Sequence, residues 1–195
     1  MKFNRITISL AIFAVALTSI VYFLEIRPAT NQAENENQIV VTESERIFPF
    51  AVKDIQQLTI EIPNQTLEFI KTDAQIHPWQ MKQPQETQAN DASISFLLNL
   101  FPQATNNQEI PINQASLAEY GLETPQGEIF VTLDNGDEYK IQVGGSNFDN
   151  SQIYGLVKFP DSASQSEGIF LMSKSFQYAI ERDLQDWQQS SDNEE

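Results

Sequence analysis

The stretch "EIFVTLDNGDEYKIQV" (residues 128–143) decides the fold, because apolar side chains alternate on both sides of an Asp-Asn-Gly turn signal. A two-residue Asn-Gly loop would set Val131 opposite Lys140 and mix apolar and charged side chains on one face. A three-residue loop sets Val131 opposite Tyr139 and gives one apolar face. We therefore predict a β-hairpin with a type I turn, in which Gly136 is left-handed within a bulge.

Strand patterns flank this hairpin on both sides in the sequence. "LTIEIPNQTLEFIK" (residues 58–71) alternates in the same way around a Pro-Asn turn. "HPWQMK" (residues 77–82) predicts a short strand with Trp79 and Met81 on one face. Two further apolar runs, in residues 151–159 and 168–172, predict two more strands.

Helical periodicity appears after each group of strands. "NDASISFLLNLF" (residues 90–101) has one apolar stripe, Asn90 or Asp91 as its N-cap, and Pro102 to end it. The stripe consists of Ile94, Leu97, Leu98 and Phe101. "SKSFQYAIERDLQDW" (residues 173–187) has a second stripe and is capped by Ser173 or Ser175. This second stripe consists of Phe176, Ile180, Leu184 and Trp187.

A third, short helix is predicted within "SLAEYGLETP", with Gly121 as its C-cap residue. The order of elements is therefore strand, strand, strand, helix, and this order occurs twice, in residues 48–103 and 120–187. Helices packed on antiparallel strands define an α+β domain with two weak β-β-β-α repeats. Whether the two copies share one sheet or form two sheets stays open.

The N-terminal segment predicts a membrane anchor. Residues 6–24 are uncharged and, as a helix, would span about 28 Å, close to the thickness of a bilayer core. Because basic residues flank the cytoplasmic end of a membrane span, Lys2 and Arg5 predict that residues 1–5 lie in the cytoplasm. Cleavage after "AVA" (residues 14–16) is the alternative, but it would leave an apolar new N-terminus.

The rest of the chain divides by composition. Residues 25–38 predict a polar linker, residues 39–187 the extracytoplasmic α+β domain, and residues 188–195 an acidic tail. The lipid bilayer is thus an expected partner of residues 6–24. The far side of the membrane would be the periplasm or, alternatively, a thylakoid lumen.

Charge and cysteine content exclude several classes of function. Two of the eleven bases precede the apolar stretch, so residues 25–195 carry nine bases against 27 acids, a net charge of −18. This charge repels phosphate backbones, so we predict no nucleic-acid partner. The chain has no cysteine, which removes disulfides and thiolate chemistry.

No motif with catalytic spacing is present, and we predict no catalytic, cofactor-binding or metal-ligating residue. His77 is the only histidine and lacks an evident partner for metal binding or base catalysis.

Asp134, Asp137 and Glu138 could suggest calcium, but a hairpin turn explains them and the spacing of an EF-hand is absent. Residues 144–150, "GGSNFDN", suggest an anion-binding nest or, more simply, a flexible loop. Arg182 is expected in a structural ion pair at the end of the last helix.

Several short motifs occur in an order that resembles a bacterial family of unknown function, domain of unknown function 4340. They are "DIQQLTIE", "WQMKQP", "NDASISFLLNL", "YGLETP", "IYGLVK" and "ERDL", within residues 48–186. The resemblance implies a membrane-attached extracytoplasmic domain, and some members are associated with ABC-type transport systems. The abundant Gln and Asn also resemble exported cyanobacterial proteins. The resemblance implies no catalytic residues.

These observations favour an interaction or accessory subunit of a membrane complex, whose protein partner is unidentified. The alternative is a module that binds a glycan, a peptide or a cation. Glycan binding would require Trp79, Phe148 and Tyr154 to share an exposed concave patch. An enzyme is the third hypothesis, and it would require convergent ionisable groups in a pocket.

Overall fold

The central hairpin forms in the register that its turn residues predict. β6 (Gly127–Leu133) and β7 (Glu138–Ser146) pair antiparallel, with Val131 opposite Tyr139. Gly136 has a φ of 87°, and its N–H donates to the carbonyl oxygen of Leu133 at 3.0 Å. A left-handed glycine thus closes a three-residue loop, and the predicted register is confirmed.

The computed structural model describes residues 46–106, 109–110, 112 and 114–189. The predicted cytoplasmic stub, the anchor, the linker and residues 190–195 of the tail lie outside the described residues. None of the helices in the described part of the chain has the length and apolarity needed to cross a bilayer. The remaining elements are η2 (Val52–Asp54), β1 (Ile55–Ile62), β2 (Gln65–Lys71), β3 (Trp79–Gln83), β4 (Thr87–Gln88), α2 (Asp91–Leu98), β5 (Glu109–Ile110), α3 (Gln114–Glu119), β8 (Gln152–Lys158), β9 (Glu167–Ser173), α4 (Ser175–Ile180) and η3 (Leu184–Trp187).

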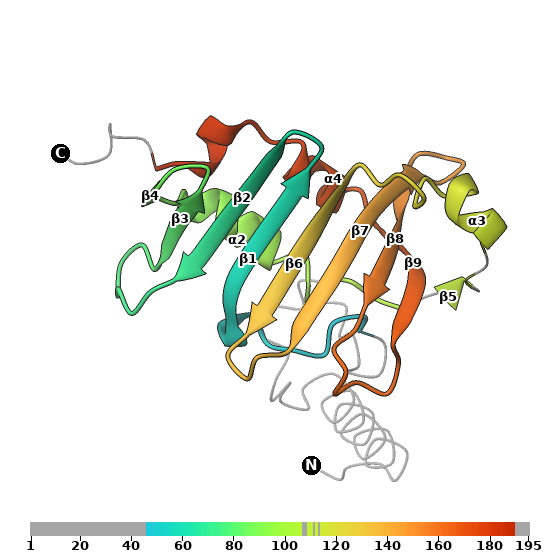
Figure 1. Ribbon diagram of the computed structural model, residues 1–195, viewed down its shortest axis with the longest axis horizontal. Coiled ribbons are helices and arrows are strands. Elements are labelled where there is room, and N and C mark those ends of the chain that lie inside the picture. The colour runs from blue at the N-terminus through green and yellow to red at the C-terminus, as the bar shows by residue number, and fades with distance from the viewer. Residues whose placement is uncertain (1–45, 107–108, 111, 113, 190–195) are drawn as a thin grey trace, which may run out of the picture. The chain divides into compact units, whose positions relative to one another are not determined.

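All strands belong to one antiparallel sheet of nine strands, in the order β4-β3-β2-β1-β6-β7-β8-β9-β5 (Figure 1). The open question of one sheet or two is therefore answered, because β1 and β6 join the two halves. Each half contributes four strands before its helix, whereas the predicted β-β-β-α order counted three; the four strands of the second half were each predicted from their own apolar runs. In the first half, the strand that the prediction missed is β4, which has only two residues.

One face of the sheet carries the main hydrophobic core. α2, α4 and η3 cover this face and lie behind the sheet in Figure 1. Phe69 of β2 packs against Trp187 of η3 with ring centroids 5.2 Å apart. Phe101, which follows α2, packs against Phe176 of α4 at 5.8 Å. Aromatic side chains therefore link both halves of the chain through one core.

The helix after the first strands is shorter than predicted. The side chain of Asn90 accepts hydrogen bonds from the backbone N–H groups of Ala92 and Ser93, so Asn90 is the N-cap. The predicted stripe extended to Phe101, but the helix ends at Leu98. Pro102 disfavours the helical conformation at the residue before it, and Phe101 reaches the core from a turn.

The last predicted helix is interrupted. α4 ends at Ile180, and the chain turns before η3 because Asp183 takes an extended conformation, with φ −65° and ψ 150°. Phe176, Ile180 and Trp187 are nevertheless buried, as predicted. The Ser173 hydroxyl accepts a hydrogen bond from the Ser175 N–H, although the N-cap position is occupied by Lys174. The apolar pattern thus predicts burial correctly and helical continuity wrongly.

The predicted C-cap at Gly121 is confirmed. Gly121 has a φ of 68°, and its N–H donates to Ala118 O at 3.1 Å. The Leu122 N–H reaches Leu117 O at 2.7 Å, and both leucine side chains belong to one apolar cluster. These two bonds and the apolar contact form a Schellman motif, which ends α3.

The first described residues pack beneath the start of β7. The Ile47 N–H donates to the carbonyl oxygen of Ala104 at 3.0 Å. Phe48 is fully buried, and its ring centroid lies 5.3 Å from that of Phe101. Phe50 lies 4.8 Å from Tyr139. The chain therefore begins its described part at the end of the sheet where β7 starts.

Candidate functional site

The face of the sheet opposite the main core is the largest candidate surface. Strand side chains alternate between the two faces, so the residues between buried core positions point to the other side. We call this side the open face, and it is the side of the sheet that is turned toward the viewer in Figure 1. It comprises Gln57, Thr59, Glu61, Glu68, Ile70, Glu128, Phe130, Thr132, Lys140 and Gln142.

Phe130 lies near the centre of the open face. It stands opposite Thr59 of β1 and opposite Lys140 of β7, and it is only partly buried. The Lys140 ammonium lies 5.2 Å from the centroid of the Phe130 ring, which is a cation–π contact. Of this pair, the aromatic ring is the residue type that is enriched at protein interfaces, whereas lysine is depleted there.

Two carboxylates hold the polar side chains of the open face in place. Glu128 accepts from Lys140 Nζ at 2.8 Å and from Gln142 Nε2 at 2.6 Å. Glu68 accepts from Gln57 Nε2 and from Gln83 Nε2, both at 3.0 Å. All four carboxylate oxygens thus have a partner. The surface is ordered before any ligand arrives, which lowers the entropic cost of binding.

The ionisation of Glu128 depends on this network. Burial alone would raise its pKa, but hydrogen bonds from Lys140 and Gln142 and the charges of Lys140 and Lys158 lower the pKa below its ordinary value of 4.5. A lowered pKa in the folded state stabilises the fold above the unfolded value, and this contribution is lost as the pH falls through the folded value. The network is therefore intact at neutral pH.

Lys140→Met should raise the pKa of Glu128, because it removes the charge while keeping an apolar stem over Phe130. At pH 7 we expect the free energy of unfolding to fall by no more than about 1 kcal/mol, since the pair is solvent-accessible. This difference should disappear below the folded pKa of Glu128. NMR titration of the Glu128 carboxyl measures the pKa, and urea denaturation at several pH values measures the stability, with Lys53→Met as the matched control. Titration of wild-type Glu128 above pH 4.5 would contradict the assignment.

A small second cluster covers the β8–β9 end of this side. Leu122, Leu156 and Ile169 are buried there beneath α3. Beside them, Tyr120 stacks on Tyr154 with ring centroids 4.3 Å apart. The open face is therefore bounded on one side by α3 and its aromatic pair.

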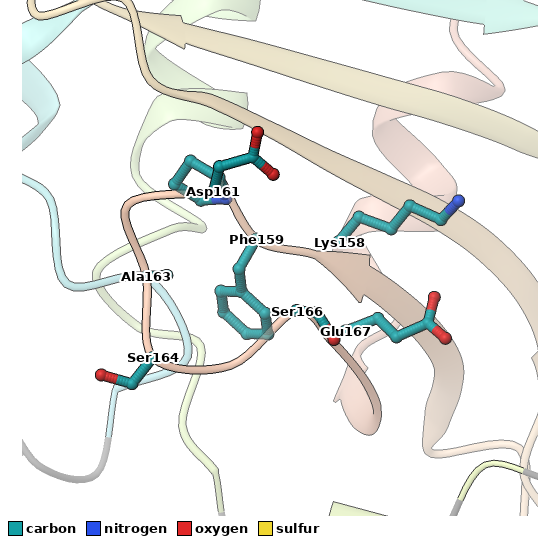
Figure 2. A pocket seen from close by; sticks show the side chains of 8 residues that line it. Lys158, Phe159, Asp161, Ala163, Ser164, Ser166 and Glu167 are labelled. Atoms are coloured by element: carbon teal, nitrogen blue, oxygen red, sulfur yellow. The ribbon is translucent and has the colours of Figure 1, made fainter.

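A pocket of about 490 Å³ lies under the loop between β8 and β9. Figure 2 shows the Phe159 ring inside this loop, with Lys158 and Glu167 extending to one side from the paired strand ends. The Ser162 hydroxyl donates to Asp137 Oδ1 at 2.8 Å and links this loop to the β6–β7 turn. The pocket is lined by both basic and acidic side chains, Lys158, Asp161 and Glu167, which suit a polar side chain or a small polar ligand.

Comparison with known proteins assigns the family. Residues 79–191, more than half of the chain, match the family described as "Domain of unknown function (DUF4340)". The chain belongs to the DUF4340 family. No curated protein and no solved structure matches it.

His77 precedes the DUF4340 region and has a partner that sequence reasoning missed. It takes a left-handed φ of 53°, and its Nδ1 contacts Asp91 Oδ2 at the start of α2. Their side chains are 46% and 40% exposed. The contact joins the β2–β3 loop to α2. The only signals of this contact in the sequence were a histidine directly before Pro78 and an aspartate at the start of a predicted helix.

The acidic turn inside the DUF4340 region has hydrogen-bond partners within the protein. Within the described residues, no three His, Cys, Asp or Glu side chains gather as metal ligands. The Asp137 carboxylate accepts hydrogen bonds from the side chains of Asn135 and Ser162.

The anion nest suggested for residues 144–150 is partly a strand. Gly144–Ser146 belong to β7, and the Gly145 N–H donates to the carbonyl oxygen of Tyr120 at 2.7 Å.

Arg182, in the "ERDL" motif of the DUF4340 resemblance, forms no ion pair among the described residues, which corrects the prediction. Its guanidinium stacks 4.6 Å from the Phe96 ring centroid and donates to Ser93 Oγ at 3.3 Å. The Ser93 hydroxyl in turn donates to Asp186 O at 2.6 Å. Arg182 therefore fastens the turn between α4 and η3 to α2.

The three aromatic residues of the glycan hypothesis are separated. Trp79 is buried in the main core, Tyr154 points to the opposite side of the sheet, and Phe148 is fully exposed on the β7–β8 loop. They form no common patch, so the geometry does not support glycan binding as that hypothesis framed it. The sequence pointed to neither Phe130 nor its contact with Lys140 as a site.

Proposed function

We propose that this chain is an interaction subunit of a membrane complex, which docks a partner protein on the open face of its sheet. The observation that carries the proposal is the ordered network around Phe130 on a face that carries no helix over β1 and β6 in the described part of the chain (Figure 1). An interface gains most from an aromatic residue that its neighbours already hold in position.

The charge of the chain supports a protein partner. The net charge of −18 over residues 25–195 opposes binding to nucleic acid or to anionic headgroups. On the open face, the charges of Glu128 and Lys140 neutralise each other. Glu61 and Glu68, also on this face, form no ion pair among the described residues, so a partner protein that covers them would have to supply positive charge.

In this proposal residues 6–24 hold the chain in the membrane, and the DUF4340 domain lies on the extracytoplasmic side. Support comes from the length of the apolar stretch and from Lys2 and Arg5 before it. The narrower form of the proposal is a subunit of an ABC-type transport system in the inner membrane of a bacterium, with the domain in the periplasm. The thylakoid lumen is the alternative location.

The test compares Phe130→Ala with Tyr178→Ala. Tyr178 is an exposed aromatic residue on α4 and is therefore a matched control away from the open face. The full chain would be cross-linked in its native membranes, purified in mild detergent, and its partners quantified by mass spectrometry. We expect Phe130→Ala to lower partner recovery about tenfold or more and Tyr178→Ala to leave it unchanged.

Circular dichroism must first show that both variants are folded. Recovery of the wild-type chain alone after cross-linking would overturn the proposed function. Equal recovery with Phe130→Ala and with wild type would remove the open face as the docking surface.

A further inference from the structure

Phe148 is an apolar side chain that the fold holds entirely in water. It lies in the loop between β7 and β8 and is fully exposed. Among the described residues, the other large apolar side chains that are exposed are Ile76, Ile112 and Tyr178, and each keeps part of its surface covered. A fully solvated phenylalanine gains nothing for the fold, because it buries no apolar area.

The loop that carries Phe148 is tied down on both sides of it. The Asn147 N–H donates to Gln152 O at 2.9 Å, and the Gln152 N–H returns to Asn147 Oδ1 at 3.0 Å. Asp149 Oδ1 accepts from the Ser151 N–H at 3.0 Å and from the Ser151 hydroxyl at 2.6 Å. Asn150 completes the turn with a left-handed φ of 58°. These bonds therefore hold the backbone on both sides of Phe148, and the ring projects from it into solvent.

The charge state of Asp149 supports this geometry. Hydrogen bonds from the side chain and then the backbone of Ser151 hold the pKa of Asp149 below its ordinary value of 3.8. The carboxylate is ionised at neutral pH and keeps its bonds. The negative charge of Asp149 therefore lies on the residue that directly follows the exposed Phe148.

The loop lies at the opposite end of β7 from the first described residues. Phe50 contacts Tyr139 at the start of β7, whereas Phe148 follows the end of that strand. A strand of nine residues spans roughly 30 Å. Figure 1 shows the loop at the end of the sheet where α3 lies. Phe148 is thus at the other end of β7 from Phe50.

We propose that Phe148 is the anchor residue of a protein–protein contact and inserts into an apolar pocket with a basic rim on the partner. The inference rests on the proposed function and adds to it a second surface, separate from the open face. The partner is a protein and not a bilayer, because Asp149 beside the ring and the net charge of −18 oppose contact with anionic headgroups. A rigid aromatic side chain costs little entropy on insertion.

The experiment uses the full chain cross-linked in its native membranes, with partner recovery as the measurement. Phe148→Ala should lower recovery by about 30-fold or more, whereas Phe148→Trp should keep it within about threefold. Ile76→Ala, which shortens another exposed apolar residue on a loop, should have no effect. Because Phe148 touches no core residue, all three variants should fold, and circular dichroism checks this.

A second arm tests the bilayer directly. The Phe148→Trp chain is reconstituted in phosphatidylcholine–phosphatidylglycerol vesicles that contain brominated lipids, which quench indole fluorescence inside the bilayer. We expect the same fractional quenching as for wild type, in which Trp79 and Trp187 are buried in the protein. Additional quenching would overturn the inference and assign the loop to the membrane.

The outcomes separate this inference from the proposed function. If Phe130→Ala loses the partner and Phe148→Ala keeps it, the proposed function stands and the inference fails. If Phe148→Ala loses the partner and Phe148→Trp keeps it, the inference holds. If wild type yields no partner, both fail.

Discussion

Replacing Trp187 with alanine should lower the free energy of unfolding by about 3–5 kcal/mol, the range for truncating a fully buried aromatic residue. Trp187 is 0% exposed and packs against Phe69, so the variant leaves a cavity between η3 and the sheet. The Trp187 carbonyl oxygen also accepts from the Asn90 N–H at 2.9 Å and holds η3 against the start of α2. Urea denaturation of the full chain, followed by circular dichroism, measures the loss.

Two further variants sharpen this test. Trp187→Phe should cost much less, because it keeps an aromatic ring and the indole Nε1 has no hydrogen-bond partner among the described residues. Tyr178→Ala, on the exposed side of α4, should change stability by less than about 0.5 kcal/mol. A loss of under about 1 kcal/mol for Trp187→Ala would show that η3 is not part of the core.

A chain shortened to the DUF4340 match, beginning at residue 79, should fail to fold. The match omits β1 and β2, yet these strands lie between β3 and β6 in the sheet. Without them β3 and β4 become an isolated pair, and two strands alone are marginally stable in water. The main core also loses buried side chains, which include Phe48, Ile55, Leu58, Ile60, Leu67 and Phe69.

Thermal unfolding monitored by circular dichroism should show no cooperative transition for the shortened chain. Removal of residues 190–195 is the control, and it should leave the midpoint unchanged. A sigmoidal transition with the midpoint of the full chain would mean that the folding unit is the matched region alone.

Local signals in the sequence were sufficient for the hairpins and caps. The register of β6 and β7 follows from a three-residue turn, and a left-handed Gly136 confirms it. Gly121 ends α3 as predicted for the same reason, because a positive φ at that position favours glycine. These features depend on residues that are close together in the chain.

Contacts between distant residues, and elements too short to show a pattern, account for the errors. The break after α4 is stabilised by Arg182, which donates to Ser93 Oγ across 89 residues of sequence. His77 and Asp91 were considered separately, and only the loop geometry brings them together. β4 was missed because two residues carry too little alternation to predict a strand.

The candidate surfaces were even less accessible from sequence. The open face exists because β1 pairs with β6, and Thr59 meets Phe130 only through this long-range pairing. The alternation of Phe130 with Ile129 and Val131 was visible, but it shows which residues share a face and not whether a helix covers that face. Phe148 was noted as an aromatic residue, but its full exposure depends on the bonds of its loop.

The central claim is that a partner protein contacts the open face, and a photo-cross-linking amino acid tests it most directly. p-Benzoyl-phenylalanine would replace Phe130 on the open face in one variant and Tyr178 on α4 in another, and both would be irradiated in living cells. The account predicts that position 130 forms a covalent adduct with one membrane-complex protein and that position 178 forms none. Adducts at position 178 with none at position 130, or none at either position, would contradict it.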